Sequence, residues 1–110
     1  MIQNVAKATV VVMNPTHYAV ALHYEAGETA APMCGAKGMN SLALRIRAAT
    51  EAAGVEVVED PPLARALYAT VQVDEQIPEQ HFQAVAKVIG FIINRGNKAS
   101  RPAPRRVSGL

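Results

Sequence analysis

Two apolar runs with different patterns lie near the beginning of the chain. Residues 8–13 (ATVVVM) are almost continuously apolar and rich in valine, which is typical of a strand buried on both faces. Residues 18–24 (YAVALHY) alternate, so the tyrosines, valine and leucine face one side and the alanines and histidine face the other. We therefore expect two neighbouring strands joined by residues 14–17.

The rest of the chain alternates between helical spacing and short valine-rich runs. Helices are expected where apolar residues recur every three or four positions, at residues 41–53, 61–68 and 78–94. Asn40 or Ser41 should cap the first helix and Gly54 should end it, and Asp60 should cap the second. Further strands are expected at residues 55–58, with weaker candidates at 32–35 and 71–73.

This order of elements predicts the fold class. Strands that alternate with helices indicate a small α/β domain, here with an antiparallel start followed by crossovers. We expect a mixed β-sheet of four to five strands surrounded by three to four helices. The link at residues 14–17 would then be a loop between two strands.

The net charge of +2 is unevenly distributed. Residues 95–110 carry five basic side chains and no acid, whereas residues 1–94 carry six basic and nine acidic ones. We therefore divide the chain into a domain at residues 1–94 and a basic, proline-punctuated tail at 95–110, which we expect to be disordered. A basic tail can touch RNA or anionic lipid, but no aromatic residue interleaves these charges, so we expect no nucleic-acid partner.

Several classes of protein are disfavoured. No apolar run approaches the roughly 20 residues that span a bilayer, and the first residues do not resemble a signal peptide. The single Cys34 cannot form an internal disulfide, which fits a reducing compartment. One cysteine and three scattered histidines do not make a zinc set, so we expect no metal and no cofactor. No phosphate loop or Ser/His/Asp arrangement indicates an ordinary enzyme, and we expect the isolated domain to be a monomer.

The link Asn14-Pro15-Thr16-His17 has an inert interpretation. Pro15 fixes φ for the second position of a turn, and β-branched Thr16 disfavours positive φ, so type I is expected over type II. Type I turns match the twist of strands poorly, which favours an open connection over a tight two-residue hairpin. His17 would then be the half-buried first residue of the following strand.

The same four residues also have a chemical interpretation. Pro15 has no N–H, so the usual attack of the next backbone nitrogen on an asparagine side chain is closed. The side-chain nitrogen of Asn14 can instead attack its own main-chain carbonyl carbon, close a succinimide and expel the Pro15 nitrogen. Thr16 can supply donors near the tetrahedral carbon, and His17 can move a proton. The residues alone leave both interpretations open.

Five motifs in order carry a resemblance to a known family. They are NPTHYAVAL (14–22), AKG (36–38), LALRIR (42–47), PPLARALY (61–68) and IPEQHFQAVA (77–86). With them, residues 1–91 resemble the cytoplasmic C-terminal domain of the FlhB/YscU family, the switch proteins of flagellar and virulence-associated type III export. Within the family, Tyr18, Leu22, AKG and PPLARALY are closer to flagellar members.

The resemblance implies a fold, an activity and a location. It implies a mixed sheet ringed by helices, single-turnover self-cleavage between Asn14 and Pro15 with both pieces remaining associated, and a switch from early to late export substrates. The implied partners are the export gate and other export-apparatus proteins, a length-control protein and the substrates. Family members have an N-terminal membrane domain, which would place this chain at the cytoplasmic face of the bacterial inner membrane as part of a longer protein.

Two features depart from the family pattern. Met33-Cys34-Gly35 departs from the family, which is aliphatic there, and this weakens the prediction of a third strand. The tail after Asn94 follows no family motif. The alternative function is a non-cleaving interaction module, in which residues 61–68 form the docking surface for export partners and the Asn-Pro link is only a turn.

Overall fold

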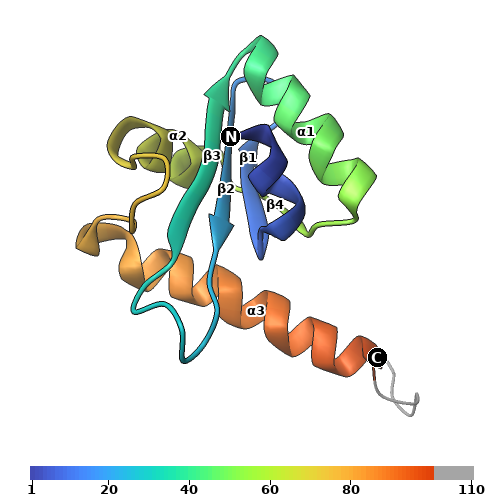
Figure 1. Cartoon of the computed structure of the whole chain (residues 1–110), viewed down its shortest axis with the longest axis vertical. Helices are drawn as coiled ribbons and strands as arrows, with labels where there is room; N and C mark the ends of the chain where they lie inside the picture. Colours follow the sequence, from blue (N-terminus) through green and yellow to red (C-terminus); the bar gives the residue numbers. More distant parts are fainter. Residues whose placement is uncertain (101–110) are drawn as a thin grey trace.

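The computed structural model describes the backbone of residues 1–100 and the side chains of residues 1–94 (Figure 1). Its sheet has four strands in the order β3-β2-β1-β4. They are β1 (Val10–Asn14), β2 (Tyr18–His23), β3 (Met33–Met39) and β4 (Val57–Glu59). The pairs β1–β2 and β2–β3 are antiparallel, and β4 runs parallel to β1, so the predicted mixed sheet is confirmed.

Helices cover both faces of this sheet. They are the 3-10 helices η1 (Ile2–Lys7) and η2 (Glu79–His81) and the α-helices α1 (Ser41–Ala53), α2 (Pro61–Thr70) and α3 (Phe82–Ser100). Figure 1 shows α1 and η1 on one face and α2 and α3 on the other. The short η1 was not predicted, because its six residues are too few to show a helical period.

The two faces of β1 feed two separate cores. Val10 and Val12 pack with residues of α2 and α3, while Val11 and Met13 pack with residues of α1 and η1. The three valines are fully buried, which confirms the prediction of a strand covered on both faces. Burial of a valine side chain contributes about 1.5–3 kcal/mol, so this strand is a main source of stability.

Local sequence signals set the ends of the helices. Asp60 caps α2, since its Oδ1 accepts a hydrogen bond from the Leu63 N–H at 3.2 Å, and Pro61 follows at the first helical position. Gly54 ends α1 in the left-handed conformation with φ of 70°. Both boundaries lie where the sequence predicted them.

Two predicted strands are corrected. β3 runs over Met33–Met39 and is longer than the predicted 32–35, because two glycines and Lys37 obscure an alternation that is clear in its burial. The segment 71–73 is not a strand: Val71 is the fully buried C-cap residue of α2. The apolar character of Val71 reflects its burial. The chain pairs with the beginning of β3 a few residues later, through a bridge from Met33 to Gln76 and backbone bonds between residues 32–34 and 74–77.

The last helix is also corrected. Pro78 precedes the 3-10 turn η2, so α3 begins at Phe82 and not directly after the proline. It continues to Ser100, past the end predicted at residues 94–96, because a single glycine weakens a helix by about 1 kcal/mol without stopping it. The rest of the predicted disordered tail, residues 101–110, lies outside the described residues.

The described residues contain neither a membrane-spanning helix nor a cluster of metal-binding side chains. None of the helices in residues 1–100 is both long enough and apolar enough to cross a membrane. Within the same part of the chain, histidine, cysteine, aspartate and glutamate do not gather in groups of three that would hold a metal ion.

The one cysteine is buried in the core on the α2/α3 face. Cys34 is 1% exposed, and burial raises the pKa of its thiol from 9.0 to about 11, against the smaller lowering effects of the Ala36 backbone and the Lys37 charge. The thiolate is the reactive form, so this cysteine is unreactive in the folded protein.

We predict that a maleimide or disulfide reagent at pH 8 labels Cys34 slowly in the native protein and rapidly in guanidinium. Because the folded pKa is the higher one, the unfolded chain loses the proton first, and folding stability falls as pH rises from 9 towards 11. Mass spectrometry of the labelled protein and urea titrations across this pH range test both statements. Equal labelling rates in the two states would contradict the burial.

Candidate functional site

The Asn-Pro link forms a short, hydrogen-bonded turn at one end of the sheet. Asn14 is the last residue of β1 and pairs with Tyr18, the first residue of β2, so three residues connect the strands. The His17 N–H donates to the Asn14 carbonyl oxygen at 2.9 Å. A tight two-residue hairpin is absent, as predicted, but the predicted open connection is wrong, because the bond from His17 to Asn14 closes the turn.

The conformation of the turn follows from its residues. Among the described non-glycine residues only Asn40 and Asp74 have positive φ, so Thr16 does not, and a type II turn is excluded as predicted. Asn14 and Pro15 are half-buried, whereas Thr16 and His17 are exposed. His17 belongs to the turn and not to β2, so its predicted place as a half-buried strand residue is wrong.

Two helix caps hold the two sides of the turn. The Asp60 N–H donates to the Met13 carbonyl at 2.9 Å, and the Asn40 N–H donates to the His17 carbonyl at 2.9 Å. Asp60 is the N-cap of α2 and Asn40 is the N-cap of α1. Helix N-termini carry partial positive charge, so both helices direct the positive end of their dipoles towards this end of the sheet, where it favours negative charge.

The Asn14 carbonyl is the group that this arrangement prepares. Its oxygen accepts the His17 N–H, which polarises the carbonyl and stabilises negative charge on that oxygen. Within the described residues, the Asn14 side chain makes no hydrogen bond that would hold it away from its own main chain. The turn therefore combines a free carboxamide, a polarised carbonyl and a proline nitrogen that cannot donate a hydrogen bond.

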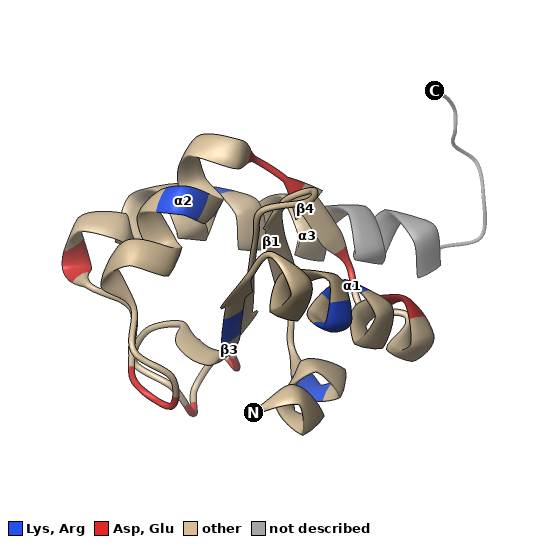
Figure 2. Ribbon diagram, turned by 90° about the horizontal axis from the view of Figure 1, so that it is seen from above, with Lys and Arg blue, Asp and Glu red and all other residues tan. Residues whose placement is uncertain are grey.

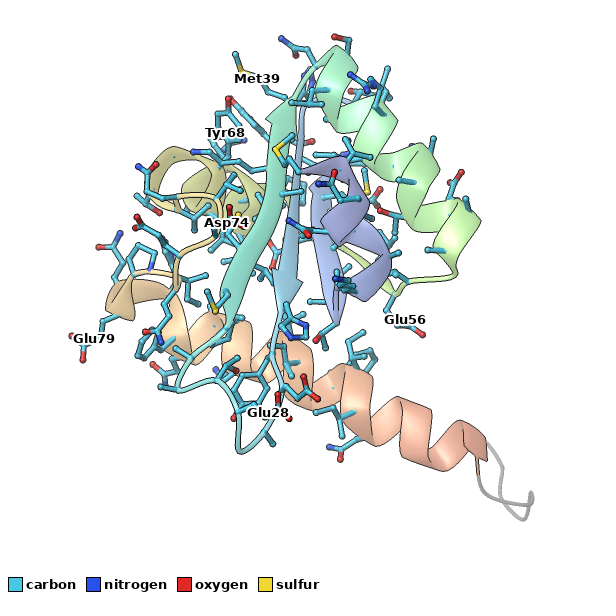
Figure 3. The ribbon with its side chains drawn as sticks, viewed as in Figure 1. Glu28, Met39, Glu56, Tyr68, Asp74 and Glu79 are labelled. Carbon is cyan, nitrogen blue, oxygen red and sulfur yellow. The ribbon has the colours of Figure 1, made fainter. Side chains whose placement is uncertain are left out.

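A lysine and two tyrosines fasten β2 and β3 to α2 beside the turn. The Lys37 Nζ donates to the carbonyls of Tyr68 at 3.1 Å and Val71 at 2.8 Å, where α2 ends. It also lies 4.9 Å from the centre of the Tyr68 ring, which is 5.0 Å from the ring of Tyr18. Figure 2 shows a basic residue in blue on β3, the strand that contains Lys37. Figure 3 shows Tyr68 near Met39, the partner of Tyr18 in the sheet.

Sequence reasoning missed the roles of Lys37 and Asn40. A charged residue at an inward position of β3 was the available signal for Lys37, and it was read only as part of a motif. Asn40 was predicted as a cap through its side chain, but that side chain makes no cap bond. It acts through its backbone N–H, which carries no sequence signal.

A separate apolar pocket lies beyond the other end of β2. It has a volume of about 370 Å³ and is formed between the β2–β3 loop and α3. Its lining residues are Tyr24, Ala30, Ala31, Pro32, Phe82, Ala86, Ile89, Gly90 and Ile93. Phe82 and Ile93 are 38% and 47% exposed, so the pocket has an apolar, water-accessible rim.

Comparison with known proteins identifies the class of domain and then the family. The fold matches the crystal structure of the cytoplasmic domain of FlhB from Shewanella putrefaciens with a TM-score of 0.79 at 41% identity, covering 84% of this chain and 76% of that one. It matches a mutant of the EscU C-terminal domain with the same TM-score at 38% identity, covering 83% of this chain and 97% of that one. The sequence model of the FlhB HrpN YscU SpaS family matches residues 1–92, and the chain belongs to this family, which is part of the type III export apparatus.

Curated relatives come from flagellar and other secretion systems. The flagellar biosynthetic protein FlhB of Bacillus subtilis is 43% identical over 98 residues, which cover 89% of this chain and 27% of that protein. FlhB of Salmonella typhimurium is 47% identical over 92 residues, 84% of this chain and 24% of that protein. The hypersensitivity response secretion protein HrcU of Ralstonia nicotianae is 44% identical over 94 residues, 86% of this chain and 26% of that protein. The chain thus spans about a quarter of the length of these relatives.

Asn40 has a backbone conformation that is strained for a residue with a side chain. Its φ of 54° and ψ of −121° form the first corner of a type II′ turn, a position that glycine prefers. We predict that Asn40→Gly raises the free energy of unfolding by about 1 kcal/mol, because it relieves strain of about 1–3 kcal/mol and loses part of that to chain entropy.

Urea denaturation measures this difference, with Asn40→Ala as the matched control. Alanine lacks the side chain and also lacks the tolerance of asparagine for positive φ, so this variant is expected to be less stable than the parent. Equal stability of the two variants would contradict the strain at this position.

Proposed function

We propose that this chain is the self-cleaving switch domain of a type III protein export apparatus, flagellar in preference to virulence-type. It cuts itself once between Asn14 and Pro15 by asparagine cyclisation, as an asparagine peptide lyase and not as a turnover enzyme. The observation that carries this proposal is the hydrogen bond of 2.9 Å from the His17 N–H to the Asn14 carbonyl oxygen. It polarises the carbonyl of the peptide bond between Asn14 and Pro15, which is the bond that the proposed reaction breaks.

The reaction needs only groups of the turn. The Asn14 Nδ2 attacks the Asn14 carbonyl carbon and gives up a proton, and the His17 N–H stabilises the oxyanion that forms. The C–N bond to Pro15 then breaks, and the proline nitrogen takes a proton to become a secondary amine. The products are a succinimide at Asn14 and a new N-terminus at Pro15, and water later opens the succinimide.

Positioning accounts for the size of the acceleration. A reaction with a half-life of years has a barrier near ~28 kcal/mol, and cleavage within minutes requires one near ~21. The difference of about 7 kcal/mol lies at the lower end of what well-oriented intramolecular groups achieve. Hydrogen bonds from the caps of α1 and α2 hold the backbone on both sides of the turn, which supports this source of acceleration.

Thr16 and His17 assist from exposed positions. The Thr16 hydroxyl is open to water and adds a donor near the reacting carbon, while the His17 imidazole exchanges the protons that leave Nδ2 and reach the proline nitrogen. The backbone of His17 acts on the oxyanion, so its side chain is an accelerator and not a requirement.

The cut pieces have reason to stay together. Residues 1–14 include β1, which lies between β2 and β4 in the sheet. Val10, Val11 and Val12 are fully buried. Burial of each valine side chain contributes about 1.5–3 kcal/mol, which is enough to hold the strand in place. Cleavage therefore changes the surface around the turn and leaves the core intact.

The switch acts within a larger assembly in this proposal. The relatives are named as flagellar biosynthetic and secretion proteins and are about four times as long as this chain. We propose that the chain is the part of such a protein at the cytoplasmic face of the bacterial inner membrane. Its partners are the export gate and other apparatus proteins, the length-control protein and the export substrates, and cleavage permits the change from early to late substrates.

A non-cleaving interaction module is the second candidate function. The observation that favours it is the apolar pocket of about 370 Å³ between the β2–β3 loop and α3. Such a pocket accepts an apolar segment of an export partner. It lies at α3, so in this function α3 would offer a docking surface in addition to the one expected at residues 61–68.

We predict that intact-mass measurement of the purified protein under denaturing conditions shows two species, residues 1–14 and residues 15–110. N-terminal sequencing of the larger piece should begin at Pro15. Asn14→Ala should remain whole, because it lacks the nucleophile. A single full-length mass after prolonged incubation would overturn self-cleavage and favour the interaction module.

We predict that His17→Ala slows cleavage by about 10²- to 10⁴-fold at most and does not abolish it, since the backbone N–H remains. The rate can be followed as the appearance of the residue 15–110 mass after rapid purification. His23→Ala is the matched control, because His23 is a half-buried histidine at the other end of β2. The His23→Ala protein should cleave at the normal rate. A folded His17→Ala protein that never cleaves would show that the imidazole is essential.

A further inference from the structure

A second asparagine stands in an unusual conformation beside the turn. Asn40 joins β3 to α1, is exposed, and has φ of 54° and ψ of −121°. Asn40 and Asp74 are the two described non-glycine residues with positive φ. The following residue is Ser41, whose small side chain leaves its backbone nitrogen open to approach.

The value of ψ places the side chain of Asn40 for ring closure. Tetrahedral geometry sets Cβ a third of a turn from the backbone nitrogen around the Cα–C bond. A ψ of −121° therefore brings Cβ into line with the nitrogen of Ser41. A five-membered ring through Cβ, Cγ and that nitrogen needs this alignment, so only rotation of the side chain separates Asn40 from a reactive geometry.

The surroundings of Asn40 leave both reacting groups available. Its side chain makes no cap bond to α1, so the carboxamide is not held away from the nitrogen. The Ser41 N–H is one of the first N–H groups of α1, which have no partner inside the helix. Partial positive charge at a helix N-terminus favours loss of this proton, and α1 has no acidic residue in its first turn to oppose it.

We propose that Asn40 is a site of spontaneous succinimide formation and deamidation, promoted by the fold. The Ser41 nitrogen loses its proton and attacks Asn40 Cγ, a new C–N bond forms, and the side-chain nitrogen leaves with a proton as ammonia. Water then opens the succinimide at either carbonyl, which gives aspartate or isoaspartate at position 40. The chain stays continuous, because the Ser41 nitrogen keeps its bond either to the main-chain carbonyl carbon, in aspartate, or to Cγ, in isoaspartate. This differs from the reaction proposed at Asn14, where proline blocks this route and the chain is cut.

The products bear directly on the turn. A new carboxylate at the N-cap of α1 interacts favourably with the helix N-terminus. Isoaspartate also adds a methylene to the main chain of residue 40 itself, whose N–H holds the His17 carbonyl at 2.9 Å. The modification thus alters one of the two anchors of the turn without touching its four residues.

The test compares one site in two states of the same protein. The Asn14→Ala chain, which keeps the proposed cleavage out of the assay, is incubated at mildly alkaline pH either folded or unfolded in guanidinium. Trypsin releases residues 38–45, and mass spectrometry with isoaspartyl methyltransferase labelling measures loss of the Asn40 amide. We expect the folded protein to react about 5- to 30-fold faster, because folding has already fixed the backbone torsions.

Asn4 provides an internal control in the peptide of residues 1–7. Its side-chain NH₂ donates to the Gly35 carbonyl at 3.1 Å, and β-branched Val5 follows it, so folding should slow its loss. Asn40→Gly should remove the signal at residues 38–45 and leave the rest unchanged. Slower reaction of Asn40 in the folded protein than in guanidinium would overturn the proposal, and so would a signal that survives in Asn40→Gly.

Discussion

The rest of the structure depends on β1, which is paired on both edges and buried on both faces. Its backbone pairs with β2 on one edge and with β4 on the other, and its side chains enter a separate core on each face. A strand with no free edge and no free face has a single favourable register. That register fixes where the strand ends, and it therefore fixes the position of the turn that begins at Asn14.

Two helix caps extend this constraint to the turn. Asp60 bonds to the end of β1 and Asn40 to the residue before β2, and these caps belong to helices on opposite faces of the sheet. The same geometry serves the chemistry proposed for Asn14 and the chemistry proposed for Asn40. In both cases the fold contributes mainly fixed torsions, and no side chain has to act as a strong base or acid.

The sequence predicted what repeats and missed what depends on contacts between distant residues. The alternation along residues 18–24 and the continuous valine run before it predicted both cores, because successive side chains of a strand point to opposite faces of the sheet. The length of β3 was underestimated, since glycine and Lys37 interrupt its apolar pattern. The turn was recognised from Asn14 and Pro15, but its closing bond and its two anchors are made by backbone N–H groups, which every residue except proline has. Lys37 and Tyr68 lie in two motifs that are 31 residues apart in the sequence, and only the structure shows that the two residues bond to each other.

The short helix η1 gives the segment before the turn a second attachment. Val5 is fully buried, and Asn4 bonds to Gly35 of β3, so residues 1–14 hold to the domain at both ends. Tension applied at Met1 would first have to dislodge η1 before it reached β1. A pull along the axis of β1 would meet resistance in shear, because the ladder bonds to β2 and β4 would have to rupture together and not one after another. A cut after Asn14 would leave these bonds in place, since β1 ends at Asn14.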